Sequence, residues 1–554
     1  MEVETIEEAE DWESWEALDS IEDDGLVHDI DSANTIHDRL QFQCRYDYDL
    51  HRFGAENSKD LSLDLYFFLP RSMGINSNSY ERKQFFSDLT NYLRIKTPFH
   101  PDWYSSDPLQ FRLHYSELYL DSSTPTSRRK NLVKAVEKEV KLFGCFLNTL
   151  LKDLKLKIKS GKQYSINPET LTIEVIRDAE DIQNRLTHFR NRYLSRILSH
   201  GSLYHEKVRK CFHLVNEYLS YRLEDNFIYI LEKIEKEFKL HSKRVKSLLN
   251  NEINYRKRHL YGVRASIKRT LAESLHYRLG LLKKYVSSVL YLKSKSIKKD
   301  SKIRNIIAAT GAALAASFAA MTEAQRYQMM QGPQASFRLG IVFIVGVVGY
   351  VLKDRIKDLS KEYFNNKLRK FLPDRDFELK LPYVSEDDTV KEYRIGICQE
   401  YMTYLKKESL PAEIQYLRQL DRRDELEPER HEEVIQYSKG IQVNLDNRPN
   451  SIAHVNQIKD IIRFDVSEML KKLSEPTKTW KYFSDEGSVE STNAPRVYHI
   501  NVIARYKLKL GHEHFDRLKI EYERFRLVLD KTGILRLESV VPRGELALSE
   551  EVPK

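Results

Sequence analysis

The residues of this chain that could do chemistry are few, and none completes a catalytic pattern. His512, Glu513 and His514 form an H-E-H triplet whose histidines would share one side of a strand. No third ligand follows at a metal-binding spacing, so we interpret the triplet as an exposed loop. The dipeptides His28–Asp29 and His37–Asp38 likewise lack the further ligands that a metal phosphohydrolase requires.

A second group imitates the PD...ExK letters of a nuclease fold. Pro373 and Asp374 are followed by Glu378 and Lys380. In such a site the two acidic residues stand on separate strands, and the spacing from Asp374 to Glu378 is too short for that. We therefore do not predict a nuclease.

Glycine is scarce, at 19 of 554 residues, and no phosphate-binding motif of the G-x-x-x-x-G-K-[ST] or G-x-G-x-x-G type occurs. No G-x-S-x-G or H-E-x-x-H motif occurs either. We therefore predict that the protein binds no cofactor and no metal ion. The sequence identifies no catalytic residues, and it favours the interpretation that the protein is not an enzyme.

The elements that would position any site are organised around two apolar runs in a polar chain. Ile306–Met321 and Leu339–Leu352 are each slightly shorter than the ~20 residues that span a bilayer, and helical flanks can supply the difference. This pattern predicts a two-helix transmembrane hairpin over residues 305–353. The alternative is a buried hairpin inside a large core.

Basic residues flank both runs, whereas the connector between them has only Arg326 and Arg338. The positive-inside rule then predicts a bacterial inner (cytoplasmic) membrane protein that crosses twice, with both termini in the cytoplasm. The flanking residues predicted to contact anionic lipid headgroups are Lys293, Lys295, Lys298, Lys299, Lys302, Arg304, Lys353, Arg355 and Lys357.

Small residues line both runs and would let helix backbones approach closely. The predicted packing positions are Gly311, Ala312, Ala315, Ala316, Ala319, Gly346 and Gly349. Either the two helices pack on each other, or these faces join several copies into an oligomer.

Charge is unevenly distributed along the chain. Residues 1–31 hold 14 Asp and Glu and no Lys or Arg, and we predict a disordered acidic tail over 1–35. Its Trp12 and Trp15 would allow a short helix on a basic surface, or the tail merely solvates the protein. Residues 254–304 carry 15 Lys and Arg against two acids. Lipid is the favoured partner of this basic stretch, and the acidic tail and nucleic acid are alternatives.

Outside the hairpin, periodicity indicates an α+β multidomain protein with a helical stalk or coiled coil. Alternating residues predict strands over 40–48 and 61–69, and a β-meander over 497–540 with a bulge near Glu523. Helical spacing predicts helices over 79–95, 399–420 and 451–473, and a coiled-coil seam from Val133 to Leu154. The predicted regions are an α+β domain (36–125), a helical stalk or bundle (126–304), a juxtamembrane helix (354–373), a second α+β domain (374–545) and a tail (546–554).

The four cysteines are isolated in sequence, which fits a reducing compartment. The favoured function is a membrane-bound, cytoplasm-facing scaffold or sensor. The alternatives are an oligomerising membrane effector that perturbs the bilayer, and an enzyme whose dispersed site leaves no local motif. The expected partners are the lipid bilayer and a protein partner or a second copy of the chain, with nucleic acid less favoured.

Overall fold

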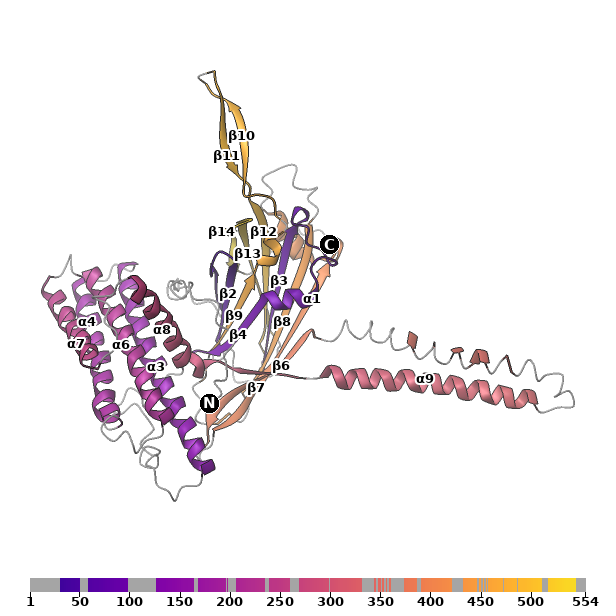
Figure 1. The fold of residues 1–554 in the computed structure, drawn as a ribbon, viewed down its shortest axis with the longest axis horizontal. Helices are drawn as coiled ribbons and strands as arrows, with labels where there is room; N and C mark the ends of the chain where they lie inside the picture. The colour runs from indigo at the N-terminus through magenta and orange to yellow at the C-terminus, as the bar shows by residue number, and fades with distance from the viewer. Residues whose placement is uncertain are drawn as a thin grey trace.

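The computed structural model describes most of the chain, with gaps. The described residues are 30–49, 58–97, 126–163, 168–195, 197, 206–234, 239–259, 269–297, 299–330, 343–344, 347–349, 351–352, 355, 358–359, 373–385, 390–420, 432–445, 448–449, 452, 455, 457–471, 473–485, 487–510 and 517–544. They form an α+β fold in which a two-layer β body carries a helical bundle and two projections (Figure 1).

The larger layer of the body is an antiparallel sheet. From edge to edge its strands are β14 (Gly533–Gly544), β13 (Arg517–Asp530), β12 (Tyr498–Leu510), β3 (Ser58–Pro70), β8 (Glu432–Asn444), β7 (Val390–Leu405), β6 (Arg375–Val384) and β5 (Lys293–Ser296). The predicted meander is confirmed as β12–β13–β14, and so is the bulge, because the β13–β14 register shifts on both sides of Arg524. The helix α11 (Ala412–Gln419) packs Ile414 and Leu417 on the outer face of this sheet.

The smaller layer has the order β1 (Ile30–Ile36), β2 (Gln41–Asp49), β9 (Gln457–Asp465) and β4 (Leu89–Ile95). Its strands come from both ends of the chain, and β3 similarly lies between β12 and β8. The segments 36–125 and 374–545 therefore contribute strands to both sheets and share one core.

Aromatic side chains fill the space between the two layers. Phe464 of β9 lies within 5.3–5.7 Å, between ring centroids, of Phe42, Phe67 and Phe85. Phe85 comes from the short helix α1 (Arg82–Asp88), which ends where β4 begins. The helix predicted over 79–95 is thus only half right, because its second half pairs with β9.

The predicted strands over 40–48 and 61–69 are confirmed as β2 and β3. The helices predicted over 399–420 and 451–473 are largely wrong. The first contains the end of β7, a 3-10 turn at Lys407–Ser409 and α11. The second contains β9 and the four-residue helix α12 (Ser467–Leu470).

The two layers are joined at both sides. On one side Tyr291 bridges to Arg94 of β4, Leu292 N–H donates to Leu93 O at 2.9 Å, and the chain continues directly into β5 of the larger sheet. On the other side Ile534 N–H of β14 donates to Arg39 O, just after β1. Gly533 permits this contact, because its φ is +145° and a Cβ there would lie 2.4 Å from Arg39 O.

A helical bundle is inserted between β4 and β5. It contains α3 (Thr126–Gln163), α4 (Pro168–Phe189) with a π-helical turn at Arg190–Leu194, α6 (Glu206–Ile234), α7 (Lys239–Arg258) and α8 (Arg269–Ser287), followed by a 3-10 turn at Ser288–Leu290. Phe189 stacks between Phe143 of α3 and Phe212 of α6, with ring centroids 4.8 and 5.4 Å away. The seam predicted from Val133 to Leu154 lies on α3 and faces this core.

After β5 the chain enters α9 (Lys299–Met330), which extends away from the body (Figure 1). Pieces of helix within residues 343–359 run beside it. We call these two segments together the α9 hairpin. A second projection is the two-stranded ribbon of β10 (Thr477–Phe483) and β11 (Val489–Pro495).

The predicted transmembrane hairpin over 305–353 is wrong. Within the described part of the chain, no helix is long and apolar enough to cross a membrane. Half of the residues in the run Ile306–Met321 of α9 are alanine, which carries little apolar surface, and Thr310 and Ser317 interrupt the run. The transmembrane part of the fold class and the twice-crossing inner-membrane location, including its cytoplasmic termini, are wrong for the same reason.

A charged cluster lies at the centre of the β body. Lys439 Nζ of β8 donates to Asp460 Oδ1 at 2.6 Å and to Asn91 Oδ1 at 2.7 Å, and Asn91 Nδ2 donates to Glu400 Oε1 at 2.5 Å. The side chains of Lys439 and Asp460 are 0% exposed. Burial is the largest single effect on the pKa of Lys439 and lowers it, but the nearby negative charges of Asp460 and Glu400 and the hydrogen bond to Asp460 act together against burial, and the pKa lies above its ordinary value.

We predict that Lys439→Ala lowers the free energy of unfolding by about 3–5 kcal/mol, because it leaves Asp460 charged and buried without its partner. The double variant Lys439→Met with Asp460→Leu should lose clearly less, since neither charge remains. Urea denaturation of the three proteins measures this. If the double variant were no more stable than the single variant, the unpaired charge of Asp460 would not be the cause of the lost stability.

Candidate functional site

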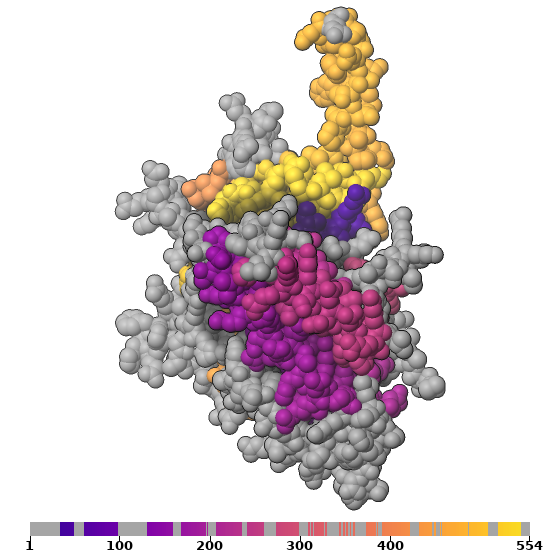
Figure 2. Space-filling view, turned by 90° about the vertical axis from the view of Figure 1, so that its left-hand side faces the viewer, coloured from indigo at the N-terminus to yellow at the C-terminus, as the bar shows by residue number. Residues whose placement is uncertain are grey.

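The most distinctive surface of the protein lies on its two projections. Every described large hydrophobic side chain that is at least 60% exposed belongs either to the ribbon or to the α9 hairpin. Viewed from the side of the bundle, the ribbon stands clear of the body as an orange column (Figure 2). These projections are the candidate functional site, because large exposed apolar side chains gathered in one place mark interaction surfaces.

The ribbon presents apolar groups on both faces. Its register pairs Trp480 with Thr492 and Tyr482 with Glu490, which places both aromatic rings on one face. Phe483 pairs with Val489 on the other face, and both are 72% exposed. The tip is a tight turn in which Ser484 N–H donates to Ser488 O and Gly487 adopts a φ of +79°.

Two contacts stiffen the ribbon without burying it. Tyr482 Oη donates to Glu490 Oε2 at 2.7 Å, and this hydrogen bond raises the pKa of the Tyr482 phenol. Thr479 Oγ1 lies 3.4 Å from Asn493 Oδ1 across the two strands. Among the described strands, β10 and β11 pair only with each other. A two-stranded hairpin alone is only marginally stable in water, so an additional contact would stabilise it.

In the α9 hairpin, small residues form part of the contact between the two segments. A Cβ on Gly349 would lie 3.4 Å from the Thr322 side chain, and Ala315 is 3% exposed. Large side chains point outward, with Met321 at 65%, Tyr327 at 66% and Phe343 at 72% exposure. The described contact between the two segments therefore involves small residues, whereas these large apolar side chains are in contact with water.

The structure distributes the predicted packing positions unevenly. Gly349 and Ala315 are buried, Ala319 is half-buried, and Ala312 and Ala316 are exposed. Gly311 lies within α9, but its surroundings are not described, and Gly346 lies outside the described residues. Whether the exposed positions join copies of the chain stays a prediction.

The predicted lipid-contacting residues do not form one described cluster. Lys293 and Lys295 lie on β5 and are exposed, and Lys293 Nζ forms an ion pair with Glu392 at 2.9 Å. Lys299, Lys302 and Arg304 belong to the first turns of α9, and Arg355 is helical and exposed. Lys298, Lys353 and Lys357 lie outside the described residues. Their contact with lipid headgroups stays a prediction that no described contact tests.

The residues singled out for chemistry are either outside the described part or engaged in local structure. The first group comprises His28–Asp29 and the triplet at 512–514. Asp374 accepts from Arg82 at 3.0 Å and from Met402 N–H at 2.8 Å. Glu378 pairs with Arg394 at 3.0 Å and with Lys380 at 3.2 Å.

The last of these candidates, His37, is buried. Burial, and then the nearby Arg463 charge, lower its pKa to about 4, so it is neutral at pH 7. Across the described ranges, no three His, Cys, Asp or Glu residues are placed to hold a metal ion.

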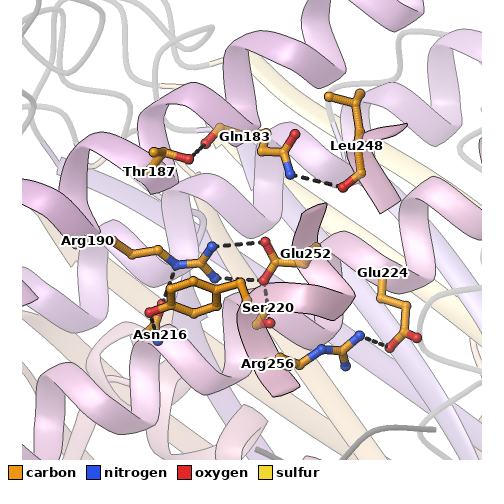
Figure 3. Close-up of polar contacts among 10 residues, drawn as sticks. Gln183, Thr187, Arg190, Asn216, Ser220, Glu224, Leu248, Glu252 and Arg256 are labelled. Atoms are coloured by element: carbon orange, nitrogen blue, oxygen red, sulfur yellow. Dashed lines mark hydrogen bonds and ion pairs between the residues drawn. The ribbon is translucent and has the colours of Figure 1, made fainter. Parts of the chain in front are cut away.

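The strongest polar constellation is one that sequence reasoning missed. It lies inside the bundle (Figure 3), where Arg190 donates to both carboxylate oxygens of Glu252, at 2.9 and 2.7 Å, and to Asn216 Oδ1 at 2.8 Å. The guanidinium also lies over the ring of Tyr255, 3.6 Å from its centroid, and Ser220 Oγ donates to Glu252. The π-helical turn that begins at Arg190 distinguishes this position from the rest of α4.

A second buried pair continues the network along α6 and α7. Arg256 Nη2 lies 2.6 Å from Glu224 Oε2, and the Arg256 side chain is 0% exposed. Glu217, also on α6, accepts from Arg278 Nε and Nη2 of α8 at 2.5 and 2.6 Å. These pairs connect α4, α6, α7 and α8 to one another. The only trace in the sequence is the four-residue spacing of Asn216, Ser220 and Glu224 and of Glu252 and Arg256, which polar surface positions also show.

The chain matches no known protein family model, no curated protein and no solved structure, so its function is argued from its own geometry.

We predict that Glu252→Ala lowers the free energy of unfolding by about 3–5 kcal/mol, because the Arg190 charge is then buried without a carboxylate. The matched control is Glu180→Ala. Glu180 makes the same two-pronged contact with Arg244, at 3.0 and 2.7 Å, but on the surface, and its loss should cost about 1 kcal/mol or less. Guanidinium denaturation compares the two variants, and equal losses would show that burial is not the cause.

Proposed function

We propose that the protein is a non-catalytic binding scaffold that contacts protein partners through the ribbon and the α9 hairpin. One observation carries the proposal: the described large hydrophobic side chains with at least 60% exposure all lie on these two projections. Elsewhere in the described part, no large hydrophobic side chain exceeds 51% exposure. Burying a side chain such as Phe483 releases about 1.5–3 kcal/mol, so covering the projections is strongly favoured.

The distribution of buried charge supports binding rather than catalysis. Lys439–Asp460 and Arg190–Glu252 are two of the buried charge pairs in the described part of the chain, and their side chains are between 0% and 7% exposed. Such pairs satisfy each other inside the core, where a substrate has no access. They help to specify the fold that holds the projections in place.

The partner of the ribbon is a protein rather than a nucleic acid. Residues 477–495 contain Lys478 and Lys481 against Asp485, Glu486 and Glu490, so the ribbon has no excess of positive charge. Binding to nucleic acid relies on neutralising phosphates with basic side chains, which this balance does not provide. Exposed Trp and Tyr side chains are instead the residues that dominate binding energy at protein interfaces.

The test is the double variant Trp480→Ser with Phe483→Ser, used as bait in affinity purification with quantitative mass spectrometry. We expect at least one stable partner of the unmodified protein to bind roughly tenfold or more weakly, because the loss of each aromatic contact costs on the order of 1–2 kcal/mol. Thermal unfolding should be unchanged, since both side chains are exposed.

The matched control is Tyr416→Ser with Leu420→Ser, which removes two exposed hydrophobic side chains from the body at α11. It should retain the partner. A partner set that is identical for both variants and the unmodified protein would contradict the proposal for the ribbon. Light scattering of the same samples shows whether the partner is a second copy of the chain.

A further inference from the structure

The outward face of α8 is a third exposed surface, separate from the two projections. Leu282 and Val286 point inward and are buried in the hydrophobic core, at 2% and 1% exposure. On the other side of the helix Tyr277 and Leu281 are 49% and 44% exposed, and Lys284 is exposed one turn further on. We call this surface the α8 face.

The surroundings of the α8 face are basic. From 269 to 297 the chain has six Lys and Arg and a single acid, Glu273. Arg278 is 53% exposed even though it pairs with Glu217. Lys293 and Lys295 of β5 are also exposed nearby, with Lys293 paired to Glu392. An occupant that matches this face combines carboxylates with apolar side chains.

Residues 1–29 have that composition. They contain 13 Asp and Glu and no Lys or Arg, with Trp12 and Trp15 among the acids. Nothing in the described structure places them, because the description begins at Ile30.

The start of β1 brings this segment near the α8 face. Asp31, Asp47, Lys459 and Arg94 are successive partners across β1, β2, β9 and β4, and Arg94 bridges to Tyr291. At ~4.8 Å per strand, Asp31 lies about 19 Å from Tyr291, just after the end of α8.

The distance onward from Tyr291 to the α8 face is short. Leu281 is about ten residues before Tyr291, or roughly 15 Å of helix. The fifteen residues from Trp15 to Ile30 span up to about 50 Å when extended, which covers the whole path.

We propose that residues 1–29 bind in cis to the α8 face, with Trp12 and Trp15 against Tyr277 and Leu281 and the carboxylates against Lys284 and its basic neighbours. The interaction goes beyond the proposed scaffold function, because its occupant is the chain itself. It makes the α8 face a surface that an external acidic partner reaches only by displacing residues 1–29.

The test is photo-cross-linking of the full chain. A benzophenone amino acid is placed at Leu281, or at Ile173 as the matched control, since both side chains are 44% exposed and both lie on the bundle. After irradiation and digestion, mass spectrometry identifies the attached peptides. We expect adducts with residues 1–29 to form several-fold more from position 281 than from position 173, in monomeric protein.

A variant with three acidic residues of the segment 1–29 neutralised tests the role of charge. Glu13→Gln, Glu16→Gln and Asp19→Asn together should reduce the adduct at position 281 to the level of position 173. The proposal would be overturned if the adduct with residues 1–29 were absent, or if its yield were equal at positions 281 and 173. It would also be overturned if neutralising the three acids left the yield unchanged, or if the adduct were found only in cross-linked dimers. The ribbon variant Trp480→Ser with Phe483→Ser should leave the yield unchanged, so failure here and failure of the scaffold function remain distinguishable.

Discussion

The structure depends on a short segment, Tyr291–Ser296, that belongs to both layers of the body. Its first residues bond to β4 of the smaller sheet, and the next four pair with β6 at the edge of the larger sheet. The entire bundle is inserted between β4 and this segment, and α9 begins three residues after it. Because backbone hydrogen bonds on both sides fix its register, the segment sets where the bundle and the α9 hairpin leave the body.

Both the body and the bundle contain buried charge pairs in their described interiors. Lys439 with Asp460 is such a pair in the body, and Arg190 with Glu252 and Arg256 with Glu224 are such pairs in the bundle. Burying charges costs free energy, so such pairs are poor sources of net stability. Their geometry is demanding, however, and a shifted helix or strand would leave them unpaired. They favour one arrangement of elements over others of similar hydrophobic content.

Sequence periodicity correctly predicted the strands in which apolar and polar residues alternate. The strands β2 and β3 alternate cleanly, and the change of phase after Tyr522 revealed the bulge in β13. It failed for β4 and β9. In β9, the apolar residues Ile458, Ile461 and Ile462 are spaced as on a helix, because the inward position between Ile458 and Ile462 is occupied by the charged residue Asp460. Pairing with distant strands makes the segment extended.

The same limitation applies to the candidate site. The two apolar runs within 306–352 suggested membrane helices because the rest of the chain is polar, but no described helix is long and apolar enough to cross a membrane. The Arg190–Glu252 contact joins residues 62 positions apart and leaves no local signal. The aromatic residues of the ribbon lie in an ordinary strand pattern, and it is their isolation from any core that makes them notable.

The position of Tyr291–Ser296 has a mechanical consequence. Backbone hydrogen bonds hold this segment to both layers of the body, and the segment connects the bundle to the α9 hairpin. A force that turns the bundle is therefore carried in part by the hydrogen bonds of this segment to β4 and β6, close to the point where α9 begins. Other contacts between bundle and body, such as that of Lys138 Nζ of α3 with Pro382 O of β6, share that force.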